Sequence, residues 1–215
     1  MSRKERERLS RRNAMLRAAQ SVFAERGFGP STLDEIASRA EFGKGTIYNY
    51  FPGGKEEILF ALLDEFYNGL IQTIETAFDA SDGRSESART RFRAFLVRIF
   101  TFLQENGDLF LIAIKEAQRH LFGDDPEKAT YFRHQHQRLV TALAEPIRQA
   151  MERREIHTMP ADAVAHMILG NVNGLYAHVC LQDRYGEKMS SVLGRPEQNA
   201  EFMSAMLFDG LSMTD

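Results

Sequence analysis

The stretch that decides the fold is STLDEIASRAEFGKGTIYNYFPGG, residues 31–54. Thr32 and Glu35 have the spacing of a capping box, in which the side chain of each residue satisfies a backbone amide of the other at the start of a helix. Residues 41–43 limit that helix to about two turns, and Pro-Gly-Gly at 52–54 ends a second short one. Two short helices joined by a tight turn predict a helix-turn-helix.

Outward from this segment, apolar residues recur at every third or fourth position, and no alternating run rich in Val, Ile and Thr occurs. We therefore predict an all-α fold. The expected helices cover residues 5–26, 32–40, 44–51, 55–78, 88–105, 108–122, 126–154, 160–182 and 197–211. Pro146 lies inside the seventh of them and should bend or split it, because proline removes a backbone donor from the helix.

Composition narrows the class of protein. The 215 residues are 43% hydrophobic and include the single cysteine Cys180, which excludes an internal disulfide and a Cys-rich zinc module. The charged start MSRKERERLSRRN is unlike an export signal, so we expect a cytoplasmic protein. Residues 163–182 contain no Asp, Glu, Lys or Arg, but their Gly, Asn and His residues favour a buried or interface helix over a membrane span.

Charge is distributed unevenly along the chain. Residues 1–55 contain 11 Lys and Arg and 6 Asp and Glu, a balance of +5, whereas residues 56–215 contain 16 and 24, a balance of −8. A basic segment attracts polyanions, of which nucleic acid is the commonest in cytoplasm. A solvated, charged helix is the alternative interpretation of the same residues.

A helix-turn-helix places its second helix in the major groove of DNA, where side chains reach base edges and phosphates. Ile47 and Phe51 are four residues apart and can anchor this helix inward. The remaining side chains that can donate hydrogen bonds are those of Lys44, Thr46, Tyr48, Asn49 and Tyr50. Thr32 offers a hydroxyl at a helix start for a phosphate, and Lys55 supplies a further cation. The basic arm at residues 3–12 either follows the DNA backbone or is frayed and solvated.

Residues 18–63 resemble the DNA-binding region of the tetracycline-repressor (TetR) family of bacterial transcriptional regulators. The shared elements are Phe23 to Phe28, Thr32, Ile36-Ala37, Lys44 to Tyr48, Tyr50-Phe51 and Lys55-Glu56. The resemblance implies phosphate contacts from Thr32, Thr46, Tyr48, Tyr50 and Lys55. It implies base-edge or mixed contacts from Lys44, Gly45 and Asn49.

The chain departs from the family pattern at three places. Glu41-Phe42-Gly43 stands where Gly-Val-Ser is usual, so Glu41 should adopt a left-handed conformation at a cost of about 1 kcal/mol. Gly43 caps the second helix without a hydroxyl. Residues 52–54 make the following connection one residue longer than usual, which makes the placement of Lys55 against phosphate less secure.

The resemblance also implies the organisation of the remainder. Residues 1–54 would form the DNA-binding domain, and residues 55–215 a helical domain in which a small-molecule effector binds and moves the helix that starts near Lys55. Aromatic and polar residues on apolar helices are candidates for its pocket, with ordinary core packing as the alternative: Phe95, Phe102, Phe110, Glu116, His120, Asn171 and Tyr176. The aromatic content favours an apolar or aromatic effector.

The helix expected at 160–182 has a second stripe, made mostly of small residues, beside its main apolar stripe. A helix that is apolar on two sides must be covered twice, which predicts a homodimer, with intramolecular packing as the alternative. The predicted interface residues are Ala163, Met167, Gly170, Gly174, Ala177, Phe202, Met203 and Met206.

Sequence signals of catalysis are weak. Glu116 and His120 are four residues apart, a spacing that favours a surface ion pair over a metal site, and no glycine-rich phosphate loop or nucleophile elbow occurs. We predict no enzyme activity, no cofactor and no metal. The predicted protein is a dimeric, ligand-responsive DNA-binding regulator, most simply a repressor of a palindromic operator. A ligand-binding or scaffolding helical protein and a helical enzyme are the alternatives.

Overall fold

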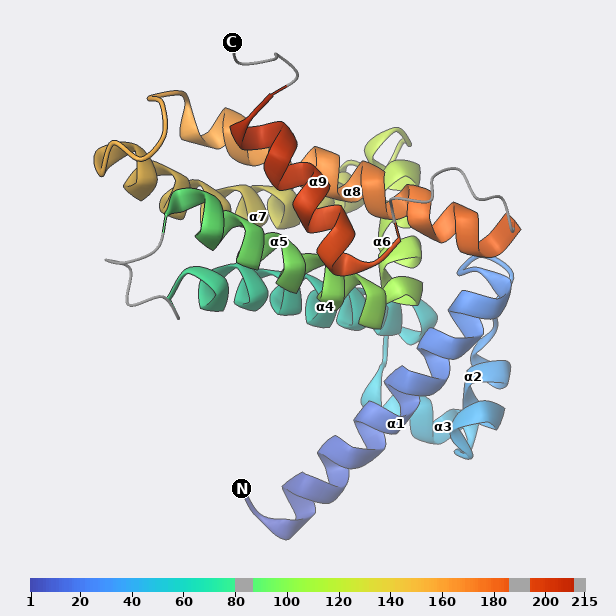
Figure 1. Cartoon of the computed structure of the whole chain (residues 1–215). Coiled ribbons are helices and arrows are strands. Elements are labelled where there is room, and N and C mark those ends of the chain that lie inside the picture. The colour runs from blue at the N-terminus through green and yellow to red at the C-terminus, as the bar shows by residue number, and fades with distance from the viewer. Residues whose placement is uncertain (80–86, 186–193, 211–215) are drawn as a thin grey trace. The chain divides into compact units, whose positions relative to one another are not determined.

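The computed structural model describes residues 1–79, 87–185 and 194–210, and every regular element in these ranges is an α-helix (Figure 1). The helices are α1 (Arg3–Arg26), α2 (Leu33–Ala40), α3 (Lys44–Tyr50), α4 (Gly54–Asp79), α5 (Ala88–Glu105), α6 (Gly107–Leu121), α7 (Pro126–Glu152), α8 (Ala161–Tyr185) and α9 (Pro196–Phe208). The predicted all-α fold is confirmed. Hydrophobic spacing therefore located the helices correctly, since their ends lie close to the expected positions.

The chain divides into two compact units. The amino-terminal unit comprises Met1–Tyr67 and Asp108–Asp124, and the carboxy-terminal unit comprises Asn68–Gly107 and Asp125–Asp215. The first half of α4 and most of α6 therefore pack with the helix-turn-helix. The boundary predicted between a DNA-binding domain at residues 1–54 and an effector domain at residues 55–215 remains a prediction.

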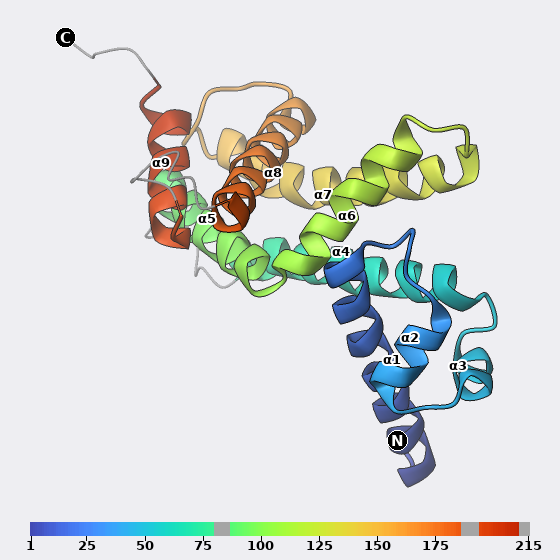
Figure 2. The ribbon, with the colours of Figure 1, turned by 90° about the vertical axis from the view of Figure 1, so that its right-hand side faces the viewer.

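Three short stretches of apolar sequence build the core of the amino-terminal unit. Phe23 of α1, Ile36 of α2 and Ile47 of α3 are each exposed by 1% or less. Complete burial of such a side chain contributes about 1.5–3 kcal/mol. Phe51, also buried, closes the end of α3, so that the inward anchoring expected for Ile47 and Phe51 is confirmed. Figure 2 shows α1, α2 and α3 together in this unit.

The turn between α2 and α3 contains the strained residue that the sequence indicated. Glu41 has φ 59° and ψ 34°, the left-handed conformation that a side chain with Cβ adopts only at a cost. Its backbone N–H donates to the carbonyl of Ser38, and the amide of Phe42 donates to the carbonyl of Ala37. The prediction for Glu41 is confirmed.

Replacing Glu41 with glycine should stabilise the amino-terminal unit by about 1 kcal/mol, because glycine adopts the left-handed conformation without the Cβ penalty. Urea unfolding followed by circular dichroism measures the change. Glu41→Gln is the matched control, since it removes the charge and keeps Cβ. Equal stability of the two variants would mean that the carboxylate, rather than the backbone conformation, limits stability here.

In the carboxy-terminal unit, α5 packs against α9 and α7 packs against α8 (Figure 1). Phe92 and Phe95 of α5 lie with ring centroids 5.9 Å apart in an edge-to-face pair, and Phe208 of α9 lies 6.1 Å from Phe92. The helix α7 runs without interruption through Pro146, so of the two expected outcomes, bending and splitting, the structure excludes splitting. The neighbouring Ile147 is completely buried, and tertiary packing of this kind stabilises a helix.

The two stripes of α8 lie in different environments. Ile168 and Val172 of the main apolar stripe are 1% and 3% exposed, whereas Met167 of the second stripe is 62% exposed. Gly170 and Gly174 are also exposed. One face of α8 is thus covered within the chain, and the second is open. Among the described residues, no helix is long and apolar enough to cross a membrane.

A pair of histidines links α7 and α8. The Nε2 atom of His136 and the Nδ1 atom of His166 are 2.9 Å apart, a distance at which one ring donates to the other and at least one is neutral. His136 is largely exposed, and its partial burial, followed by the charge of His166, lowers the pKa of its imidazole below 6.5. In the folded chain, protonation of His136 is therefore disfavoured.

The unfolding free energy should consequently fall as the pH is lowered through 6.5, because the unfolded chain then binds the proton more readily than the folded chain. His136→Gln should flatten this part of the pH profile of urea unfolding. The exposed carboxyls of Glu25 and Glu35, whose pKa values also lie below their usual 4.5, act only at lower pH. A profile between pH 7.5 and 5 that is identical in wild type and variant would contradict the role of His136.

Candidate nucleic-acid interface

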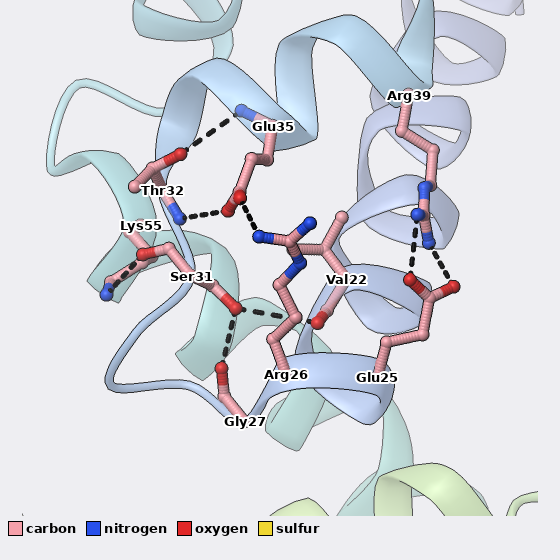
Figure 3. Close-up of polar contacts among 9 residues, drawn as sticks. All are labelled: Val22, Glu25, Arg26, Gly27, Ser31, Thr32, Glu35, Arg39 and Lys55. Carbon is pink, nitrogen blue, oxygen red and sulfur yellow. Dashed lines mark hydrogen bonds and ion pairs between the residues drawn. The ribbon is translucent and has the colours of Figure 1, made fainter.

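Charged side chains fix α2 against α1 (Figure 3). The guanidinium of Arg39 donates to Glu25 Oε2 at 2.8 Å and to Ser21 Oγ at 2.7 Å, and Arg26 pairs with Glu35. Hydrogen bonding from Arg39 lowers the pKa of the Glu25 carboxyl. These pairs are exposed and contribute modestly to stability, but they orient α2 through two points.

The predicted capping box at the start of α2 is confirmed. The amide of Glu35 donates to Thr32 Oγ1 at 3.3 Å, and the amide of Thr32 donates to Glu35 Oε2 at 3.0 Å. This backbone bond is the main cause of the lowered pKa of Glu35. Because the Thr32 oxygen acts here as an acceptor, its hydroxyl hydrogen remains available for a phosphate.

Lys55 has an unexpected structural position. Its Nζ atom donates to the carbonyl oxygens of Phe28, Gly29 and Ser31 at 2.8, 2.9 and 2.8 Å, and it lies 4.6 Å from the centroid of the Phe28 ring. Ser31 is 3% exposed and donates to the carbonyl of Gly27 at 2.6 Å. Lys55 and Ser31 thus hold the connection between α1 and α2 (Figure 3).

These contacts change the role expected for Lys55. A lysine ammonium has three hydrogens, and three carbonyls occupy all of them. In this arrangement none is free for a DNA phosphate, so the direct phosphate contact expected from the sequence does not fit the observed geometry. Lys55 instead positions the start of α2, where Thr32 lies.

The helix α3 presents its polar side chains outward. Tyr48 is 44% exposed, and Lys44, Gly45 and Asn49 are exposed as well. Thr46 and Tyr50 are half-buried. The Nζ atom of Lys44 lies 2.8 Å from Asp34 Oδ2, and this hydrogen bond raises the pKa of the lysine. Gly43 caps the helix without a side-chain hydrogen bond, as expected.

The basic arm is helical. Helix α1 begins at Arg3 with a capping box formed by Ser2 and Glu5. The guanidinium of Arg8 lies 6.0 Å from the Tyr50 ring, and that of Arg12 lies 5.2 Å from the Phe51 ring. Part of the arm therefore lies beside the end of α3, where it adds positive charge to the same surface.

The residues predicted for the effector pocket do not form one group. Phe110, Glu116 and His120 belong to the amino-terminal unit, whereas the other four belong to the carboxy-terminal unit. Glu116 Oε2 lies 3.6 Å from His120 Nε2, and the two residues are 7% and 9% exposed, so the expected pair is buried rather than on the surface. In the described ranges, no three His, Cys, Asp or Glu residues converge as a metal site would require.

The remaining candidates have diverse environments. Phe95 is completely buried, Tyr176 is 6% exposed and Phe102 is half-buried, which suits core packing. Asn171 is exposed and donates to the carbonyl of Met167 at 2.9 Å. Neither the burial of the aromatic residues nor the hydrogen bond of Asn171 indicates a ligand, so the pocket role of these residues remains a prediction.

The predicted dimer surface is mostly open. Phe202 and Met206 of α9 are 45% and 40% exposed, Ala163 of α8 is exposed and Ala177 is half-buried. Met203 is only 5% exposed because its side chain packs inside the carboxy-terminal unit. Met203 is therefore unsuited to contact a partner directly, and the candidate surface consists of the other residues.

Comparisons with known proteins support the interpretation of the amino-terminal unit. Residues 15–62 match the family of bacterial regulatory proteins named tetR. The regulator YuxN of Bacillus subtilis, which is uncharacterized, is 29% identical over 113 residues, 53% of this chain and 35% of that protein. The transcriptional activator FasR of Mycolicibacterium smegmatis is 31% identical over 96 residues, 45% of this chain and 42% of FasR. The chain spans less than half the length of these two relatives.

A solved structure agrees over nearly the whole chain. The regulator FadR from Bacillus subtilis, in complex with stearoyl-CoA, superimposes with a TM-score of 0.74 over 93% of this chain and 98% of FadR, at 20% identity. The fold and the exposed α3 define a helix-turn-helix protein with a second helical unit. Residues 15–62 match the model of the tetR family of bacterial regulatory proteins, so the resemblance seen in the sequence is confirmed for this segment.

Proposed function

We propose that this protein is a transcriptional regulator that binds an operator in double-stranded DNA through α3 and the start of α2. The observation that carries the proposal is the exposure of the polar side chains of α3 on a helix whose Ile47 and Phe51 are fixed in the core. Lys44 and Asn49 would contact base edges. The hydroxyls of Thr32, Thr46, Tyr48 and Tyr50 would contact phosphates, with Gly45 allowing close approach of the backbone.

We further propose a homodimer formed by the open face of α8 and the exposed residues of α9. A two-fold dimer presents two α3 helices to successive major grooves about 34 Å apart, which favours a palindromic operator. The expected location is the cytoplasm, where the operator is. Occupation of the operator would block transcription, so we propose a repressor rather than an activator.

An effector would bind in the carboxy-terminal unit and favour a conformation that does not match the operator. The complex of FadR with stearoyl-CoA supports an effector with a long apolar part. A preference of about 3 kcal/mol for the non-binding conformation reduces operator affinity on the order of a hundredfold.

Fluorescence anisotropy with duplexes from the DNA upstream of the protein's own gene tests the proposed function. We expect specific binding that weakens steeply with salt. Lys44→Ala and Tyr48→Ala should each reduce affinity about tenfold, the effect of losing one contact of about 1–2 kcal/mol. Lys115→Ala, at an exposed lysine of α6, is the control. Absence of any specific duplex, or equal affinities of all three variants, would refute DNA binding through α3.

A further inference from the structure

An open groove lies in the carboxy-terminal unit, between the end of α7, the connection at residues 153–160, the start of α8 and the end of α9. Its volume of about 830 Å³ lies within the range of about 300–1,000 Å³ found for small-molecule sites. None of the pocket residues expected from the sequence lines it. The groove is therefore a site for which the sequence pattern gave no signal.

The walls of the groove are apolar. They are formed by Met151 of α7, Val164 and Ile168 of α8, and Met206, Leu207 and Phe208 of α9. Methionine and branched aliphatic side chains adapt to flexible hydrocarbon and offer it no hydrogen-bond partner. The chemistry of the walls suits an alkyl chain.

One part of the lining carries a basic side chain and an imidazole. Arg154 and His157 both line the groove, and neither has a hydrogen bond, ion pair or ring contact from its side chain among the described residues. The nearby acidic residue, Glu155, is already paired with the guanidinium of Arg91, which is 7% exposed. Glu155 is the acidic residue of the lining, so no other carboxylate of the lining faces the charge of Arg154, whose planar guanidinium suits two oxygens of one anion.

The backbone at Arg154 adds a second observation. Arg154 has φ 59°, the left-handed conformation. The amide of Arg154 donates to the carbonyl of Met151 and that of Glu155 to the carbonyl of Ala150, the pattern of a helix end at which glycine is usual. The chain thus has an arginine where glycine would fold more readily, and strained residues of this kind cluster at functional sites.

We propose that this groove binds an anionic amphiphile, with the alkyl chain against the apolar walls and a carboxylate or phosphate head on Arg154 and His157. Its assignment as the effector site rests on the proposed function, whereas the binding itself does not. A free fatty carboxylate and an acyl thioester of coenzyme A share this chemistry. Met167 and Met206 of the candidate dimer surface also line the groove, and the positive charge of Arg154 favours an anionic ligand over a second copy of the chain at this part of it.

Isothermal titration of the full chain with dodecanoate, dodecanoyl-CoA and dodecan-1-ol tests the proposal. We expect at least one of the two anionic compounds to bind, and dodecan-1-ol, which has the same chain without the charge, to bind at least tenfold more weakly than the better anion. The stronger of the two anions identifies the source of the ligand. Failure of both anions to bind, or equal binding of the alcohol, would overturn the proposal.

Arg154→Gly separates binding from folding. Because glycine suits the left-handed conformation, this variant should melt at the same or a higher temperature than wild type while its affinity for the anion falls at least tenfold. Arg153→Gln is the matched control, since Arg153 lines a different, smaller cavity, and it should bind as wild type does. Unchanged affinity in Arg154→Gly would overturn the role of Arg154.

Val164→Trp tests the walls, because the larger ring should fill the groove and abolish binding of the anion. Sedimentation of Val164→Trp tests the alternative that a second copy of the chain covers the groove. A change from dimer to monomer, with amphiphile binding unchanged, would support that alternative and overturn the proposal. Operator binding by Arg154→Gly in the absence of amphiphile should equal that of wild type. Loss of operator binding in wild type itself would refute the proposed function and leave the titrations valid.

Discussion

Lys55→Met lowers the unfolding free energy of the amino-terminal unit by about 3 kcal/mol, because it removes a charged donor from the three carbonyls of Phe28, Gly29 and Ser31. The methionine retains the apolar stem, so the loss reports mainly on the ammonium. We expect operator affinity to fall as well, since the connection that Lys55 holds leads directly into Thr32. Urea unfolding and fluorescence anisotropy measure the two effects.

A lysine that acted only on a phosphate would give a different result. Lys55→Met would then keep the stability of wild type, and the dependence of affinity on salt would decrease by about one phosphate contact. Lys4→Met is the matched control, because Lys4 is an exposed lysine of α1. Equal stability of the two variants would contradict the structural role that the contacts of Lys55 indicate.

Gly170→Glu should convert the proposed dimer into monomers. Apart from its chain neighbours and the backbone of its own helix, a Cβ atom added at Gly170 meets no described atom within 4 Å, so the isolated fold should tolerate the substitution. In a two-fold interface it would bury two carboxylates without partners, at a cost of about 3–5 kcal/mol. The dissociation constant of the dimer should rise at least about a hundredfold, as measured by sedimentation equilibrium, and operator affinity should fall with it.

The control for this variant is Gln137→Glu, which adds the same charge to an exposed position of α7. It should leave the dimer intact. Glutamate favours a helix more than glycine does, so the substitution should not by itself destabilise the monomer. The melting temperature of monomeric Gly170→Glu checks this expectation. A dimer that sediments as wild type would show that the open face of α8 is not the interface.

Local patterns predicted much of this protein. The spacing of apolar residues located the helices because an amphipathic helix requires a repeat of about 3.6 residues wherever it packs. The capping box of Thr32 and the left-handed Glu41 follow from interactions over three or four residues, which a sequence displays directly. The two faces of α8 were visible for the same reason.

The surroundings of other residues could not be predicted, because they depend on distant parts of the chain. The family resemblance implied a phosphate contact from Lys55, but its ammonium is bound by carbonyls more than twenty residues earlier. Met203 has the polarity of an interface residue, but the packing of α9 buries it. Phe110, Glu116 and His120 lie in a different unit from the other pocket candidates, because α6 packs with the amino-terminal unit.

The order of residues thus determined the helices, their caps and the polar surface of α3, since each depends on neighbours within about one turn or two. Only the tertiary structure decided that Lys55 is occupied, that Met203 is inside, and that Arg154 and His157 face an apolar groove built from α7, α8 and α9. The reason is physical: a side chain's partners across the fold are chosen by how whole helices pack, and no local repeat records that choice.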